Sequence, residues 1–243
     1  MAAKLLAACI SFIRLSAMKW MIALCLACAA MPAWSGIYIY GTRIIYPAQK
    51  KDITVQLMND GKRSSLIQAW IDNGDTSLPP EKLQVPFIMT PPVIRVAANS
   101  GQQLKIKKLA NNLPGDRESL FYLNVLDIPP NSDENKDKNI IKFALQNRIK
   151  LIYRPPGVQK VDKATFSRLQ LLRAPGSISV KNNSANWITI PEIKAKSKVN
   201  KETLLLAPWS SQSITTTVVV NSYTVTLIDD SGNYLNETVK IEN

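Results

Sequence analysis

Residues 149–157, Ile-Lys-Leu-Ile-Tyr-Arg-Pro-Pro-Gly, combine a strand pattern with an abrupt stop. The first, third and fifth residues of this stretch are bulky and apolar, which is the period of a β-strand with one buried face. Pro155 and Pro156 then interrupt the pattern, because proline donates no hydrogen bond to a β-ladder and stiffens the chain. We therefore expect a strand to end at residue 154 and a second domain to begin after it.

The same alternation recurs on both sides of this stop. The runs before it are residues 53–57, 66–71, 93–97, 104–106 and 120–126, and those after it are residues 177–180, 187–190, 213–220 and 223–228. Clusters of Asn, Asp, Gly and Pro separate the runs, and no long stretch keeps a helical period. About seven short strands before the stop is typical of an immunoglobulin-like sandwich. The pattern predicts an all-β protein with two such sandwiches, residues 36–154 and 155–243.

Residues 1–35 have the features of a secretion signal. They carry basic but no acidic side chains, an apolar run over Met21–Ala30, and the small-residue site Ala33-Trp34-Ser35. This order predicts a leader that is cleaved before Gly36, with a start at Met18 as an open alternative. The other interpretation is a membrane anchor, but the continuous apolar run is shorter than the ~20 residues that a span needs. We expect no stable membrane insertion after cleavage.

The composition excludes several kinds of chemistry. The chain has 3 cysteines and no histidine, and Cys9, Cys25 and Cys28 all lie in the predicted leader. The mature chain therefore lacks the usual zinc ligands and the usual proton shuttle. We expect no metal, no cofactor and no histidine-based catalysis. Stability must come from packing without disulfides, although an exported protein could form them.

The mature chain carries a net positive charge. The sequence has 30 Lys and Arg against 18 Asp and Glu, and three of the basic residues lie in the leader, which leaves 27 against 18 and a net charge of about +9. This excess favours an acidic partner or surface. Nucleic acid is not the expected partner, because the protein is predicted to be exported and its basic residues form no dense run.

Several stretches resemble one known family. They are Gly41-Thr42-Arg43-Ile44-Ile45-Tyr46-Pro47, Gln68-Ala69-Trp70, Thr90-Pro91-Pro92, Leu113-Pro114-Gly115-Asp116-Arg117-Glu118-Ser119-Leu120-Phe121, and Arg148-Ile149-Lys150-Leu151-Ile152-Tyr153-Arg154-Pro155. Together, and in this order, they resemble the PapD-like periplasmic pilus (fimbrial) chaperones of the chaperone-usher pathway. The second domain matches more weakly, through its length and the turn Asp229-Asp230-Ser231-Gly232.

The resemblance implies two sandwiches arranged as a boomerang and a periplasmic location. It implies a chaperone that binds and stabilises pilus subunits by donor-strand complementation and delivers them to an outer-membrane usher for fimbria assembly. In that mode of recognition, an extended strand of one protein completes the sheet of another. Free chaperone could also self-associate to cover its donor strand.

The family motif also implies an anchor for the C-terminal carboxylate of the client. Its two basic residues correspond to Arg43 and Lys150. A guanidinium and an ammonium suit this role, because both give charge-assisted hydrogen bonds to a partly enclosed carboxylate.

The strand that leads into Lys150 corresponds to the family's donor strand. Its candidate residues are Ile141, Phe143, Leu145 and Asn147, which occupy alternate positions and so share one face. From the residues alone, such alternation more often indicates a strand that faces its own core. The polar loop at residues 129–138 comes just before this strand and is expected to be exposed.

A third group corresponds to the family's charge cluster between the two sandwiches. Glu118 and Arg154 belong to it, together with Asp230 or its neighbour Asp229. Exposed ion pairs usually contribute little to stability, so the alternative is a surface pair without consequence. The run Thr90-Pro91-Pro92 is a candidate for a cis peptide bond, which is common only before proline.

Two other classes of function remain as alternatives. The first is a secreted β-sandwich structural subunit or adhesin, although pilins typically rely on a disulfide that this mature chain cannot form. The second is an enzyme that uses Asp116 with Glu118 as an acid pair, or Ser119 as a nucleophile. That serine has no histidine partner in the chain.

Overall fold

The computed structural model describes residues 20–21, 36–130, 141 and 143–242. Nearly all of the predicted leader, and residues 131–138 of the predicted loop, lie outside the described residues. Residues 1–35 form one unit and residues 36–243 another, and the second unit is described below. Within the described residues, no helix has the length and hydropathy needed to cross a membrane.

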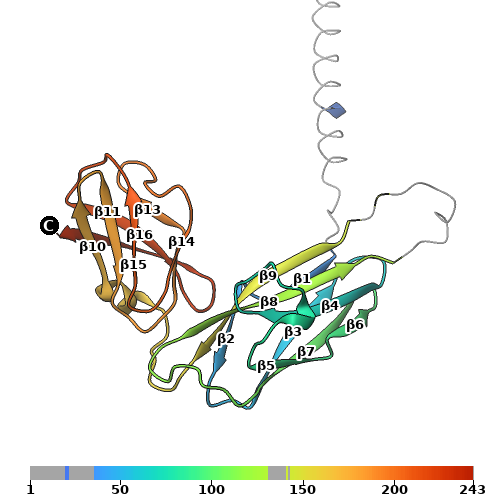
Figure 1. The fold of residues 1–243 in the computed structure, drawn as a ribbon. Coiled ribbons are helices and arrows are strands. Elements are labelled where there is room, and N and C mark those ends of the chain that lie inside the picture. The colour runs from blue at the N-terminus through green and yellow to red at the C-terminus, as the bar shows by residue number, and fades with distance from the viewer. Residues whose placement is uncertain (1–19, 22–35, 131–140, 142, 243) are drawn as a thin grey trace, which may run out of the picture. The chain divides into compact units, whose positions relative to one another are not determined.

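The first half of this unit is a sandwich of two β-sheets (Figure 1). Its strands are β1 (Ile37–Ile39), β2 (Arg43–Pro47), β3 (Asp52–Asn59), β4 (Ser65–Asp72), β5 (Phe87–Thr90), β6 (Val93–Val96), β7 (Ser100–Lys108), β8 (Ser119–Ile128) and β9 (Leu145–Arg154), with a short 3₁₀-helix η1 (Pro80–Lys82). One sheet has the order β1-β3-β7-β5 and the other β2-β9-β8-β4-β6. All neighbours are antiparallel except β2 and β9, which run parallel.

The chain passes from one sheet to the other near its start. β1 pairs with β3 in the first sheet, whereas β2 pairs with β9 in the second. Gly41 lies between them with a φ of 94°, a conformation that glycine adopts without steric cost. This bend allows β1 and β2 to join different sheets.

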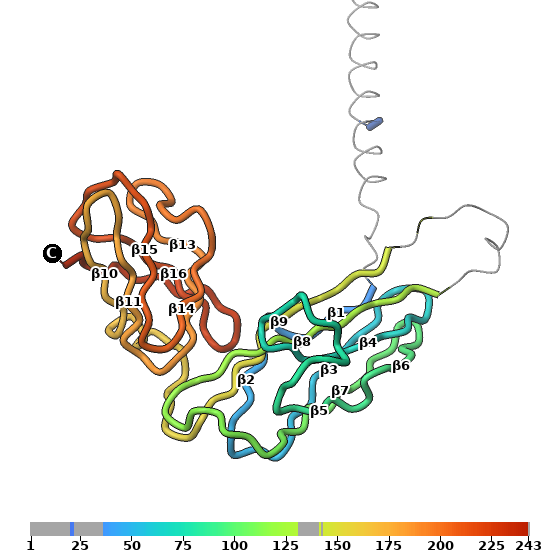
Figure 2. The backbone as a smooth tube through the Cα atoms, in the orientation of Figure 1, coloured from blue at the N-terminus to red at the C-terminus, as the bar shows by residue number. Residues whose placement is uncertain are grey.

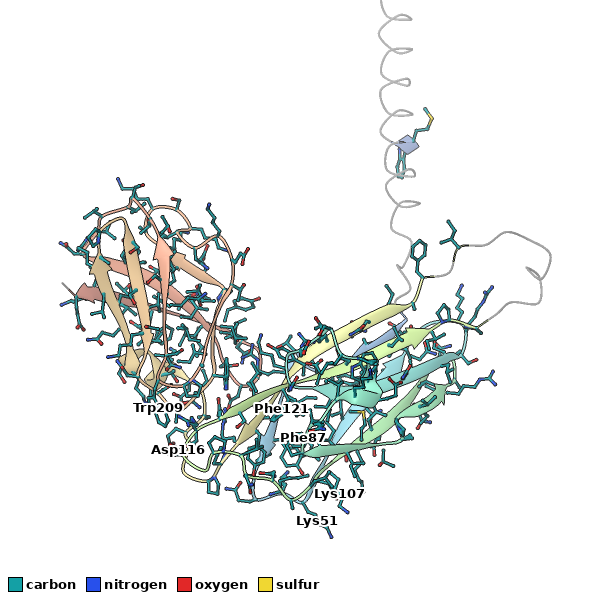
Figure 3. All side chains as sticks on the ribbon, viewed as in Figure 1. Lys51, Phe87, Lys107, Asp116, Phe121 and Trp209 are labelled. Carbon is teal, nitrogen blue, oxygen red and sulfur yellow. The ribbon has the colours of Figure 1, made fainter. Side chains whose placement is uncertain are left out.

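Alternate side chains of the two sheets fill the core between them. Phe87 and Phe121 point toward each other there (Figure 3), with ring centroids 5.0 Å apart in an edge-to-face arrangement. Tyr46 is fully buried, and its hydroxyl group donates to the carbonyl oxygen of Lys51 over 2.9 Å. The period-two pattern of the sequence therefore corresponds to burial on one face of each strand.

The second half folds around a separate core. Its elements are the 3₁₀-helix η3 (Lys163–Arg168) and the strands β10 (Leu169–Ala174), β11 (Ser177–Asn182), β12 (Ile188–Ile190), β13 (Glu192–Lys194), β14 (Leu204–Leu206), β15 (Ser211–Thr215), β16 (Ser222–Ile228) and β17 (Tyr234–Glu242). One sheet has the order β13-β16-β17-β10-β11-β15, and β12 pairs with β14. Figure 2 traces this part of the chain from yellow through orange to red.

The predicted end of the strand at residue 154 is confirmed, because β9 ends at Arg154, directly before the two prolines. The first core cluster draws on residues up to Tyr153, and the second begins at Phe166. The all-β class is also confirmed, since the described helical residues after residue 35 form only short 3₁₀ turns.

One strand prediction was wrong. The run at residues 213–220 was expected to form a strand throughout, but β15 ends at Thr215. Its neighbour β11 begins at Ser177, which is the register partner of Thr215, so no strand remains to pair with the following residues. Instead, Val218 donates its backbone N–H to the hydroxyl group of Thr216 over 3.1 Å in a local turn.

Other strands were not predicted. These are β5, β10, β13, β14 and β17, which are short, lie between recognised runs or have mostly exposed residues. The expected cis peptide bond is present between Thr90 and Pro91.

Candidate functional site

The apolar row of β9 continues beyond the core of its own sandwich. Leu151 is fully buried, and Ile149, two residues earlier on the same face, is only partly buried. Leu145, Phe143 and Ile141 are exposed to 65%, 75% and 83%. Within ten residues, the apolar side chains of this segment therefore change from buried in the core to exposed to solvent.

The reason lies in the neighbouring strand. β8 ends at Ile128, and its last register pair with β9 joins Asp127 to Leu145. Beyond this pair, none of the described residues forms a strand beside the chain, so β9 begins at Leu145, and Ile141 and Phe143 precede it. The prediction of a continuous strand from Ile141 was wrong in this respect, and the alternative that these apolar residues face their own core is contradicted by their exposure.

The other side of β9 is open over the same stretch. β2 pairs with β9 only from Lys150 to Arg154. From Leu145 to Ile149, the described residues provide no strand on the β2 side. Asn147, the fourth predicted donor residue, is exposed, and its side-chain amide donates to the carbonyl oxygen of Ile37 over 3.3 Å. An unpaired edge with large apolar side chains is a surface on which another strand can add.

Arg43 and Lys150 are direct register partners on β2 and β9. Neighbouring residues in register project to the same face, so the tertiary structure brings the two predicted anchor residues together. They lie where the open edge of β9 meets the paired part. Two cations on one small area create a positive local potential, which would attract an anion.

Both cations are incompletely partnered. Arg43 donates from Nη1 to the carbonyl oxygen of Ile228 over 3.2 Å, but its buried Nε atom has no hydrogen-bond partner among the described residues. No hydrogen bond or ion pair of the Lys150 ammonium is found within the same residues. Burial lowers the pKa of Lys150, and the nearby charge of Arg43 lowers it further. Burial likewise lowers the pKa of Arg43.

A buried charge cluster joins β9 to the second half of the chain. Arg154 Nε donates to Glu118 Oε1 over 2.5 Å, and its two terminal nitrogens donate to the carboxylate of Asp230 over 2.5 and 2.8 Å. Burial lowers the pKa of Arg154, but the hydrogen bonds to Asp230 and the charge of Glu118 outweigh this effect, and the net pKa is raised.

The structure also separates the two candidate acids. Asp230 pairs with Arg154, whereas Asp229 accepts hydrogen bonds from Ser231 and Asn233 within its own turn. Adjacent residues in a turn point in different directions, which the sequence alone could not resolve.

Sequence reasoning missed two partners of Glu118. Its second carboxylate oxygen accepts from the backbone N–H of Trp187 over 2.7 Å, and the side chain of Asn186 donates to the first over 3.1 Å. The sequence analysis assigned Trp187 to a strand-like run and contained no signal for either contact.

A second polar network, also missed, supports the outer face of β9. Arg148 binds both carboxylate oxygens of Asp72, at 2.6 and 3.1 Å, and its guanidinium lies 3.6 Å from the ring centroid of Tyr122. Asn124 links this network to Gln146. Burial raises the pKa of Asp72, but the hydrogen bonds from Arg148 and Asn124 more than compensate, and its net pKa is lowered. These contacts hold the first half of β9 against β8 and β4.

The candidate catalytic residues do not form a site. β8 begins at Ser119, so Asp116 and Glu118 precede it and share no strand face. The side chain of Asp116 is 65% exposed and that of Glu118 is fully buried in the charge cluster. Within the described residues, no group of three or more acidic side chains could hold a metal ion.

The fold and the open edge define a class of protein: a two-sandwich, immunoglobulin-like binding protein that presents an unpaired apolar strand end beside two cations. The family model described as pili and flagellar-assembly chaperone, PapD N-terminal domain, matches residues 36–159. The model for the C-terminal domain of the pili assembly chaperone PapD matches residues 162–239. The chain belongs to the PapD family of pili assembly chaperones, whose members are periplasmic and are not enzymes.

Individual relatives agree with this assignment. The chain is 57% identical over 224 residues to the probable fimbrial chaperone YehC of Escherichia coli K12. The matched region covers 91% of this chain and 94% of YehC. The chain is 41% identical over 206 residues to the chaperone protein MrkB of Klebsiella pneumoniae, covering 82% and 88% of the two chains. The crystal structure of the Pseudomonas aeruginosa CupB2 chaperone matches with a TM-score of 0.72 and 31% identity, over 84% of this chain and all of CupB2.

A solved complex of Salmonella enterica contains the SafB chaperone with the SafA pilin. It matches with a TM-score of 0.74 over 87% of this chain and 99% of that chain, at 21% identity, and therefore bears on the fold alone. Taken with the family models and the relatives, the fold is that of a fimbrial chaperone.

Proposed function

We propose that this fimbrial chaperone acts in the periplasm after removal of residues 1–35, with sandwiches at residues 36–154 and 155–243. It captures pilus subunits by donor-strand complementation and passes them to an outer-membrane usher. The observation that carries the proposal is the exposed apolar row of Ile141, Phe143 and Leu145 next to an unpaired edge. Usher delivery rests on membership of the family.

The row supplies what an incomplete subunit sandwich lacks. A subunit without its last strand exposes core side chains and an unpaired backbone edge, and both promote aggregation. The edge of β9 would satisfy that backbone, and the apolar side chains of Leu145 and of Ile141 and Phe143, which precede the strand, would enter the cleft. Burying three large side chains at about 2 kcal/mol each gives roughly 6 kcal/mol before ordering costs.

Arg43 and Lys150 would fix the register of this pairing. A carboxylate at the end of the client would accept hydrogen bonds from the unpartnered Arg43 Nε and from the Lys150 ammonium. The attraction also repays the cost of holding two neighbouring cations in a partly buried position. Because a one-residue slip moves every donor side chain to the other face, an end anchor favours one register.

The test is co-expression of the mature chain with a pilin from the same gene cluster. We expect wild type to yield a one-to-one complex in size-exclusion chromatography of periplasm, and Arg43→Ala and Lys150→Ala to lose it. Lys107→Ala serves as the control, because this lysine is exposed on β7 in the other sheet. A complex that survives both anchor substitutions, with all variants folded, would show that the two cations are only surface charge.

The alternative of a structural subunit or adhesin is tested by the same preparation. A chaperone remains in the soluble periplasmic fraction, whereas a subunit is found in purified fibres. Self-association of the free chaperone through its open edge would appear as a client-sensitive dimer in the same chromatogram.

A further inference from the structure

Asp127 is a buried acid without a cationic partner among the described residues. It lies on β8 two and four residues after Val125 and Leu123, which are fully buried, so its side chain is directed between the two sheets. The residue is only 9% exposed. No ion pair of Asp127 is found among the described residues, and its Oδ1 atom has no hydrogen-bond partner there.

The other oxygen is weakly satisfied. Oδ2 accepts a hydrogen bond of 3.4 Å from the backbone N–H of Ile37, at the start of β1. A buried carboxylate that is neither paired nor fully hydrogen-bonded is costly. The fold therefore leaves a place for a positive group next to Asp127.

Gly36 marks that place. A Cβ atom built on Gly36 would lie 2.9 Å from Asp127 Oδ2, so a side chain at this position would collide with the carboxylate. The Cα–N and Cα–Cβ bonds are of nearly equal length and have tetrahedral directions. If Gly36 were the first residue, a rotation about its Cα–C bond would bring the α-nitrogen to this point, at ion-pair distance from Oδ2. Glycine makes such a rotation inexpensive.

We propose that removal of the leader creates an ion pair between the new α-ammonium group of Gly36 and the carboxylate of Asp127. Water, acting with a leader peptidase, hydrolyses the peptide bond between residues 35 and 36, which leaves a carboxylate on Ser35 and an amine on Gly36. The amine takes up a proton at neutral pH, because the ordinary pKa of an α-amino group is about 7.7–8.0. The inference rests on the proposed cleavage site, and it is independent of client capture.

The ion pair would lie at the base of the donor strand. Asp127 faces Leu145, the first residue of β9, across the β8–β9 pair. On the other side, Asn147 contacts the carbonyl group of Ile37. The ion pair would restrict the start of β1, which lies beside Asp127 and accepts the hydrogen bond from Asn147. The precursor lacks this ion pair, because its nitrogen at residue 36 is an uncharged amide.

A double-mutant cycle tests the proposal. Chains that begin at Gly36 or at Ser35 are released from a fusion by a protease that leaves no extra residue, each with and without Asp127→Asn. We expect the Gly36 start to raise the folding equilibrium constant about fivefold to thirtyfold over the Ser35 start, as measured by urea unfolding. Asp127→Asn should abolish this difference. Equal stability of the two starts, or a difference that persists in Asp127→Asn, would overturn the proposal.

A mass measurement on the periplasmic protein separates this question from the earlier ones. A first residue other than Gly36 would refute both the cleavage site and a natural role for the ion pair between Gly36 and Asp127. Loss of client capture in the anchor variants has no bearing on the cycle, so the two proposals can fail independently.

Discussion

At the scale of single residues, Lys150, one of the two proposed anchor residues, carries its charge in an unfavourable environment. Burial and the charge of Arg43 both lower the pKa of Lys150 below its ordinary value of 10.5, so the free protein holds this proton less tightly than an exposed lysine does. A bound carboxylate would counter both effects. Its binding would raise the pKa of Lys150, and binding would be linked to proton uptake at alkaline pH.

This linkage predicts how affinity depends on pH. The pKa of Lys150 is lower in the free protein than in the complex. The affinity for the client carboxylate is therefore greatest below the pKa of the free protein, and it falls as the pH rises from that value to the pKa of the complex. The decrease should reach up to tenfold per pH unit between the two values. Titration calorimetry of a peptide with the client's C-terminal sequence, from pH 7 to pH 10.5, measures it. Lys150→Arg should flatten the curve, because arginine stays charged, and an equally steep curve in this variant would contradict the assignment.

At the scale of elements, one face of β9 is divided into a buried part and an exposed part. The second half of the strand belongs to the core of the first sandwich, whereas Leu145 at its start is exposed, and Ile141 and Phe143, which precede β9, lie beyond the last pair with β8. The Arg148–Asp72 ion pair and the Asn124–Gln146 hydrogen bond hold the opposite face. The strand is therefore supported from one side while its apolar row and its other edge stay open.

Substitutions along this face should separate binding from stability. Phe143→Ala and Leu145→Ala remove exposed side chains, so the free energy of unfolding should change by less than about 0.5 kcal/mol for each. Client affinity should fall about thirtyfold for each, which corresponds to about 2 kcal/mol of lost burial. Leu151→Ala is the matched control on the same face, and it should cost about 2–5 kcal/mol of stability because Leu151 is fully buried. Unchanged affinity in both exposed variants would exclude this row from the client contact.

At the scale of the whole molecule, two cores are linked through a small number of polar contacts. Arg154 and Glu118 belong to the first half, whereas Asp230, Asn186 and Trp187 belong to the second. The side chains of Arg154 and Glu118 are 12% and 0% exposed. Ion pairs at this depth are expensive to break, because the remaining partner keeps an uncompensated charge.

The adjacent acids offer a matched test of this coupling. Asp230→Asn removes a charge that pairs with Arg154, so calorimetry should show a lower unfolding temperature and two resolved transitions in place of one. Asp229→Asn changes only a turn contact and should keep the wild-type profile within about 2 °C. Identical profiles for the two variants would mean that the Arg154–Asp230 pair does not couple the sandwiches.

The sequence determined the features that depend on local periodicity. The alternation of apolar and polar residues predicted most strands, and Pro155 predicted the end of β9. The motifs, including the one around Lys150, indicated the family. The family motif also predicted Arg43 and Lys150 as the anchor residues, although only the parallel pairing of β2 and β9 makes them neighbours. Strands such as β13 and β14 escaped prediction because three residues are too few to show a period.

The tertiary structure decided what depends on distant partners. Whether the row from Ile141 to Leu145 faces its own core or solvent depends on where β8 ends, which alternation cannot reveal because the two cases share one pattern. The choice of Asp230 over Asp229 depends on the geometry of a turn, and the closeness of Gly36 to Asp127 depends on two sheets meeting. Local sequence thus sets which face of a strand is apolar, and the packing of distant elements sets what that face meets.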